Sequence, residues 1–91
     1  MMLAERVRRF VVLNYIEPAR IRSERFVVIV ARDVIKGLRL KNRSAAVCNA
    51  LDAEKFFEGN GLSLFERRGP KQGRTVAWVL AIEYAAPPAA K

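Results

Sequence analysis

Two short segments near the end of the chain flank a glycine-rich turn, and they limit the fold more than any other part of the sequence. Residues 75 to 84 are rich in Val, Trp and Ile, and Gly69-Pro70-Lys71-Gln72-Gly73 lies between them and residues 62 to 68. This pattern predicts two strands joined as a hairpin. Because an isolated hairpin is only marginally stable, the rest of the chain must form elements that cover its apolar face.

The first part of the chain supplies helical and strand patterns. Apolar residues recur at three- and four-residue steps over residues 3 to 16, so we expect an amphipathic helix there, which Pro18 ends or kinks. Residues 24 to 30 contain a β-branched run typical of a buried strand, although the same run could begin one long helix that continues to Ile35. Helical spacing resumes over residues 33 to 38.

A further helical segment precedes the hairpin. Ala45, Cys48 and Leu51 repeat every three residues and define a predicted buried face. We expect one long helix or two abutting helices over residues 43 to 58, with Asn42 as the N-cap and a glycine-rich stretch closing the segment.

The order helix, strand, helix, helix, hairpin predicts an α+β fold in which three helices pack on a small antiparallel sheet. Residues 1 to 84 form one domain in this prediction, and residues 85 to 91, which have two prolines and little to bury, form a disordered tail. The aromatic residues expected to pack beneath the sheet are Phe56, Phe57, Phe65 and Trp78.

Several function classes find no support in the sequence. Cys48 is the one cysteine and there is no histidine, so we expect no internal disulfide, no metal site and a core role for Cys48. No residues form a catalytic set or a cofactor motif, which predicts a non-enzymatic protein without a cofactor. The chain lacks a membrane-spanning apolar run and a secretory pattern, so a cytoplasmic location and no membrane partner are expected.

Positive charge is concentrated in two regions of a chain whose net charge is +8. Residues 31 to 51 carry five cations against one carboxylate, and residues 62 to 75 carry four against one. Residues 52 to 61, which lie between them, carry one cation against three carboxylates. The charge predicts an anionic partner such as nucleic acid. Arg supplies most of the cations, as in some heat-adapted proteins.

Residues 32 to 82 resemble a winged helix-turn-helix domain of the small stand-alone prokaryotic type. The resemblance is carried by the helix at residues 33 to 38, the Leu38-Arg39-Leu40 turn, the helix at residues 43 to 51 and the Glu66-Arg67-Arg68-Gly69-Pro70 entry to a wing. Arg39 stands where the family's turn usually has glycine. The resemblance implies a three-helix core with a short strand and a C-terminal hairpin wing. It also implies binding to duplex DNA, in preference to RNA, by a recognition helix in the major groove.

Specific side chains are expected to contact the nucleic acid. Arg43 is the best candidate for bidentate contact with guanine, and Asn49 for adenine or a phosphate. Ala46 and Val47 are expected to face the groove with little bulk. The full predicted binding set is Arg39, Lys41, Asn42, Arg43, Asn49, Arg67, Arg68, Lys71 and Arg74.

Other functions fit parts of the same pattern. Winged domains also serve as protein-interaction subunits of transcription and replication complexes, and the charge fits an RNA-binding or ribosome-associated factor equally well. A homodimer is also expected if a core this small leaves the first helix partly uncovered; the apolar residues concerned are Leu3, Val7, Phe10 and Tyr15.

Overall fold

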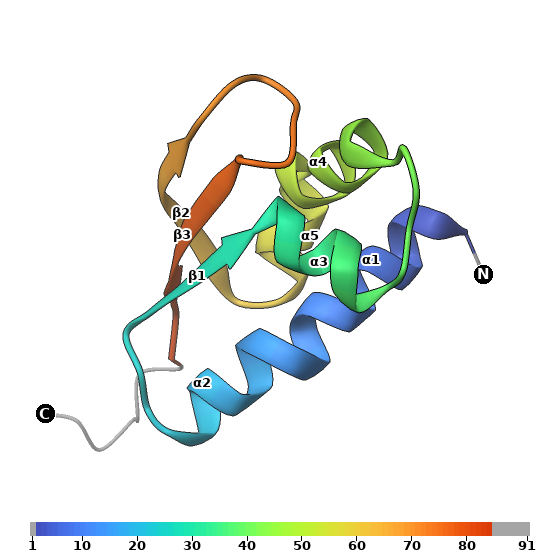
Figure 1. Ribbon diagram of the computed structural model, residues 1–91. Helices are drawn as coiled ribbons and strands as arrows, with labels where there is room; N and C mark the ends of the chain where they lie inside the picture. Colours follow the sequence, from blue (N-terminus) through green and yellow to red (C-terminus); the bar gives the residue numbers. More distant parts are fainter. Residues whose placement is uncertain (1, 85–91) are drawn as a thin grey trace, which may run out of the picture.

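The computed structural model describes residues 2–84, so the tail predicted at residues 85–91 lies outside the described residues. The elements are α1 (Leu3–Val11), the π-helical turn η1 (Val12–Ile16), α2 (Glu17–Ile21), β1 (Phe26–Val30), α3 (Ala31–Gly37), α4 (Ser44–Asp52), α5 (Glu54–Gly59), β2 (Leu62–Arg68) and β3 (Ala77–Ile82). The protein is α+β, as predicted, and its helices lie on one side of a three-stranded antiparallel sheet (Figure 1).

The N-terminal helix is longer than predicted because Pro18 does not end it. Elements α1, η1 and α2 follow one another without a break and form one helix from Leu3 to Ile21, the long helix (Figure 1). Pro18 has no backbone N–H to donate to the carbonyl four residues earlier, and its ring crowds that carbonyl. The π-helical turn directly before Pro18, where the Glu17 N–H bonds to the Val12 carbonyl, is a local widening that accommodates the ring.

The sheet has the strand order β1-β3-β2, so β3 is the central strand. Trp78 of β3 lies opposite Ile29 of β1 and opposite Arg67 of β2. The strand predicted at residues 24 to 30 and the hairpin are therefore confirmed, and the alternative of one helix reaching Ile35 is wrong. Because β1 pairs with the second hairpin strand, residues far apart in the sequence lie side by side.

A β-bulge in β2 corrects the prediction for Phe65. The register of β2 against β3 shifts between Leu64 and Glu66, which leaves Phe65 as the extra residue. Phe56 and Trp78 are buried as expected, but Phe65 is 65% exposed and meets the Phe26 ring edge-on with the centroids 5.0 Å apart. Phe57 is half-buried and packs against the core.

The helical segment before the hairpin is two helices, because Ala53 adopts an extended conformation between α4 and α5. The turn before α4 contains two residues with left-handed backbone conformations, Arg39 (φ 56°) and Asn42 (φ 53°). Asn42 is therefore not the N-cap; Arg43 holds that position and makes no side-chain cap bond. Asn tolerates the left-handed region well because its short polar side chain bonds locally, and Arg39 adopts a conformation that glycine takes most readily.

The core lies between the helices and the inner face of the sheet, and it includes much of the long helix. Val7 is fully buried, and Leu3, Phe10 and Tyr15 pack partly buried against the core. These four residues therefore pack against the core, and a homodimer formed through the N-terminal helix stays a prediction. The amphipathic pattern correctly predicted a helix, and the apolar face of that helix packs against the core of the same chain.

Gly37 is the site of a close approach between α3 and the long helix. A Cβ atom at position 37 would overlap the end of the Phe10 ring, which itself packs edge-on against Tyr15. We expect Gly37→Ala to lower the free energy of unfolding by about 1–2 kcal/mol, although alanine is the better helix former. Urea unfolding followed by Trp78 fluorescence measures the change.

Gly59 is the matched control for this substitution, because nothing lies within 4 Å of a Cβ placed there. Gly59→Ala is expected to leave stability unchanged or to raise it by up to about 1 kcal/mol. Equal effects of the two substitutions would contradict the packing of Phe10 on Gly37.

Candidate nucleic-acid interface

Helix α4 presents a narrow, small-residue face to solvent. Val47, Cys48, Ala50 and Leu51 are buried, whereas Ala45 and Asn49 are exposed. The prediction for Cys48 is thus confirmed, but Ala45 was wrongly placed in the core and Val47 wrongly placed toward a groove. A three-residue repeat drifts around a helix that has 3.6 residues per turn, so spacing alone did not fix the centre of the buried face.

The residues before α4 bring three polar side chains to the surface. Lys41, Asn42 and Arg43 are all exposed in the turn that leads into the helix. Arg39 is exposed as well and directly follows Leu38, the C-cap of α3. Among residues 2–84, no hydrogen bond or ion pair is recorded for the side chains of Lys41 and Arg43. These two cations are therefore available to an external anion.

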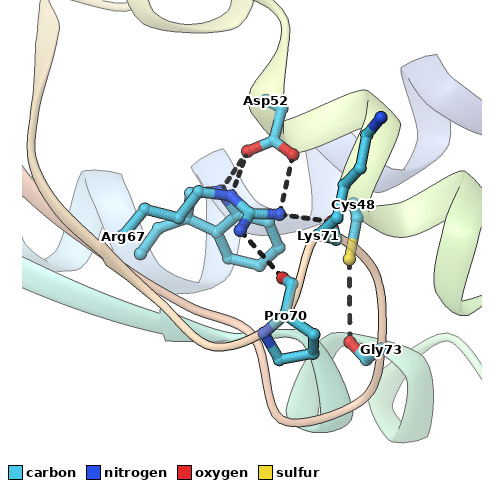
Figure 2. Close-up of polar contacts among 7 residues, drawn as sticks. Cys48, Asp52, Arg67, Pro70, Lys71 and Gly73 are labelled. Atoms are coloured by element: carbon cyan, nitrogen blue, oxygen red, sulfur yellow. Dashed lines mark hydrogen bonds and ion pairs between the residues drawn. The ribbon is translucent and has the colours of Figure 1, made fainter.

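A partly exposed ion pair joins the end of α4 to the hairpin. Arg67 donates from Nε to Asp52 Oδ1 at 2.8 Å and from Nη2 to Asp52 Oδ2 at 3.0 Å (Figure 2). The Trp78 Nε1–H donates to the same Asp52 Oδ1 at 2.7 Å, and the guanidinium lies 5.6 Å from the centroid of the Trp78 ring. We call Asp52, Arg67 and Trp78 the clamp. The hydrogen bond to Asp52 raises the pKa of Arg67 further above its usual value, so the guanidinium stays charged.

The clamp also holds the β2–β3 loop, residues 69–76. Arg67 Nη1 donates to the Pro70 carbonyl at 2.9 Å, and Arg67 Nη2 donates to the Lys71 carbonyl at 2.6 Å (Figure 2). The buried Cys48 thiol of α4 contacts the Gly73 carbonyl at 3.6 Å. The loop is therefore fixed against α4 by its main chain, and its side chains are left for other contacts.

The four cations predicted for the hairpin tip have different environments. Arg67 is engaged in the clamp, with its side chain 22% exposed. Arg68 lies on the surface and forms an ion pair with Glu66, which lowers the pKa of that carboxyl. Lys71 and Arg74 are exposed, and Figure 2 shows the Lys71 side chain extending away from the Arg67 guanidinium.

Arg32 joins this surface although the predicted binding set did not contain it. The Arg32 N–H donates to the Arg74 carbonyl at 3.0 Å, and the neighbouring Ala31 N–H donates to the Val76 carbonyl at 2.8 Å. The start of α3 is thus tied to the loop, and two exposed Arg residues lie beside each other in the structure. Only the pairing of β1 with β3 could have revealed this neighbour, since 42 positions separate the two residues.

The carboxylates of the predicted acidic stretch, residues 52 to 61, do not all lie where the sequence predicted. Asp52 is the only carboxylate of α4, and the sequence placed it with Glu54 and Glu58 on a helix end pointing away from the basic surface. Instead it lies beside the loop, where Arg67 neutralises it. Glu54 and Glu58 are exposed on α5, beyond the break at Ala53. Arg67 therefore offsets the one charged side chain that α4 contains.

Other kinds of site are not found within residues 2–84. No group of His, Cys, Asp and Glu side chains there has the arrangement of a metal site. No helix in this part of the chain is both long enough and apolar enough to cross a membrane. Comparisons with models of known families, with curated proteins and with solved structures gave no match.

Proposed function

We propose that the protein is a winged helix-turn-helix domain that binds duplex DNA. In this proposal α3 and α4 form the helix pair, α4 is the recognition helix, and the β2–β3 loop is the wing. Support comes from the order of elements, in which the long helix, a strand, three helices (α3, α4 and α5) and a hairpin follow one another. Further support comes from Arg39, which takes the left-handed conformation in the turn between the two helices.

The observation that carries the proposal is the attachment of a basic loop to the end of α4, a helix that two exposed cations, Lys41 and Arg43, precede. The clamp and the Cys48–Gly73 contact hold the loop against α4. The same ion pair neutralises the one carboxylate of that helix. A preorganised surface of this kind avoids the entropy cost of ordering a flexible loop when an anionic ligand binds.

The exposed side chains have the chemistry that duplex recognition needs. Cations position a protein on the phosphate backbone, and we assign this role to Arg32, Lys71 and Arg74, together with Lys41 at the other end of α4. Arg43, at the N-cap of α4, has a guanidinium that can donate two hydrogen bonds to guanine O6 and N7. Asn49 lies on the exposed face of α4, where its side-chain amide can donate to adenine N7 and accept from adenine N6–H. The small Ala45 side chain on this face permits close approach to base edges.

Two predicted contacts are revised in the proposal. Arg67 acts as a positioning residue, since four of its hydrogen bonds go to Asp52, Pro70 and Lys71. Arg68 is a peripheral contact because it must first leave Glu66. The resulting role is that of a transcription regulator or a chromosomal protein, without catalysis and without a cofactor.

Fluorescence anisotropy with duplex DNA, single-stranded DNA and RNA of the same sequence, at two salt concentrations, tests the proposal. We expect the tightest binding to duplex DNA and weaker binding at the higher salt concentration, because released counterions favour the complex. Binding to none of the three at low salt would remove the assignment to nucleic acid. Tighter binding to RNA, lost on Phe65→Ser, would instead place the ligand on the exposed aromatic pair of the sheet.

A further inference from the structure

The long helix keeps one face free of the core, and this face combines apolar and charged residues. Leu13 is 51% exposed and Ile21 is 83% exposed, while Arg9 and Glu17 are exposed at the positions four residues before and after Leu13. Residues four apart share a helix face. Leu13 therefore lies at the centre of a stripe whose charges have opposite signs on its two sides.

We propose that two copies of the protein pair through this stripe, with their long helices antiparallel and the two Leu13 side chains meeting at the two-fold axis. Such an axis places each residue n positions after Leu13 opposite the residue n positions before it in the second copy. Arg9 of each copy then faces Glu17 of the other, so one arrangement forms two ion pairs. A parallel arrangement would place like charges opposite each other.

The same symmetry gives Ile21 a place to bury its side chain. A hollow of about 450 Å³ lies on the N-terminal half of the stripe and is lined by Glu5, Arg8, Arg9, Val12, Leu13 and Asn60. Ile21, eight residues after Leu13, falls opposite Glu5 of the second copy and thus at this hollow. The most exposed large apolar side chain among residues 2–84 would be covered there, against Val12 and Leu13.

The outer face of the sheet is the main alternative surface. Phe26, Val28 and Phe65 are exposed there as well. The long helix is favoured for a second copy because its charges are self-complementary, which an interface between identical chains requires. The inference does not depend on the proposed DNA binding, since none of the stripe residues belongs to that contact set.

Charge-reversal variants of Arg9 and Glu17 test the antiparallel arrangement of the two long helices. Arg9→Glu alone, and Glu17→Arg alone, each create like charges at two symmetric positions, and we expect each to weaken self-association about tenfold in low salt. An equimolar mixture of the two single variants restores opposite charges at both positions, in a heterodimer. The double variant restores them in a homodimer. Sedimentation equilibrium measures all four.

Two further variants separate this surface from the alternative. Leu13→Asp is expected to abolish self-association, whereas Phe65→Ser leaves it unchanged; circular dichroism checks that the helix of each variant is intact. A wild-type protein that stays monomeric at the highest soluble concentration would overturn the proposal. So would a mixture of single variants that fails to recover, or an association that is lost with Phe65→Ser and kept with Leu13→Asp.

Discussion

Replacing Asp52 by alanine is expected to lower the free energy of unfolding by about 2 kcal/mol. The Arg67 and Asp52 side chains are 22% and 36% exposed, so solvent screening limits the ion pair to less than about 1 kcal/mol. The larger loss comes from Trp78, which is 1% exposed and would keep an Nε1–H donor without an acceptor. A buried donor left unsatisfied costs about 1–3 kcal/mol. Urea unfolding measures the sum.

Three further variants identify the cause of this loss. Asp52→Asn keeps an acceptor for Trp78 but removes the charge, so its effect should be about half as large. Glu58→Ala, an exposed carboxylate on the neighbouring helix, should change stability by less than about 0.5 kcal/mol. In a double-mutant cycle, Arg67→Ala and Asp52→Ala should be strongly non-additive because the residues touch. Additive effects, or a negligible effect of Asp52→Ala, would contradict the clamp.

Removing four cations, two from the turn that leads into α4 and two from the loop, is expected to weaken duplex binding about 10³-fold in 0.1 M salt. Each phosphate contact contributes a slope of about 0.9 in log affinity against log salt, and Lys41, Lys71 and Arg74 are assigned to phosphates. The quadruple alanine variant of Lys41, Arg43, Lys71 and Arg74 should therefore lower the slope by about 3. Anisotropy titrations over a salt series measure both quantities.

A matched variant tests whether position or net charge is responsible. The alanine variant of Arg6, Arg22, Arg25 and Lys55 also removes four exposed cations, but from the long helix, the turn after it and α5. Its affinity should stay within about tenfold of the wild type, because only long-range attraction is lost. Equal losses in the two quadruple variants would show that binding depends on net charge and not on this surface.

The role of Arg67 in the clamp could not be predicted from the sequence. Arg67 and Arg68 are adjacent cations before a turn, and nothing in the sequence distinguishes them. The bulge at Phe65 shifts the strand by one residue, and a one-residue shift exchanges the two faces of a strand. Arg67 therefore shares a face with Trp78 and reaches Asp52, while Arg68 faces outward. Without the bulge, Glu66 would lie opposite Trp78 and Arg67 would face outward.

Other parts of the fold were predictable because their signals are local. The β-branched run before α3 and the glycine-rich turn of the hairpin each determine their own element, and both were placed correctly. The end of the long helix was not placed correctly from the sequence. A proline removes one backbone hydrogen bond, and the helix can respond either by ending or by widening one turn. The contact between Arg32 and Arg74 depends on strand pairing across the whole domain, so no local pattern contains it.

The most direct test of the proposed interface is an NMR titration of the ¹⁵N-labelled protein with duplex DNA. We expect the largest amide shift changes at residues 39–49 and 71–74 and at Arg32. The amide shifts of the exposed stripe around Leu13 on the long helix, and those of Phe26 and Phe65, should remain unchanged. Changes confined to the long helix or to the outer face of the sheet, with α4 and the loop unaffected, would contradict the account.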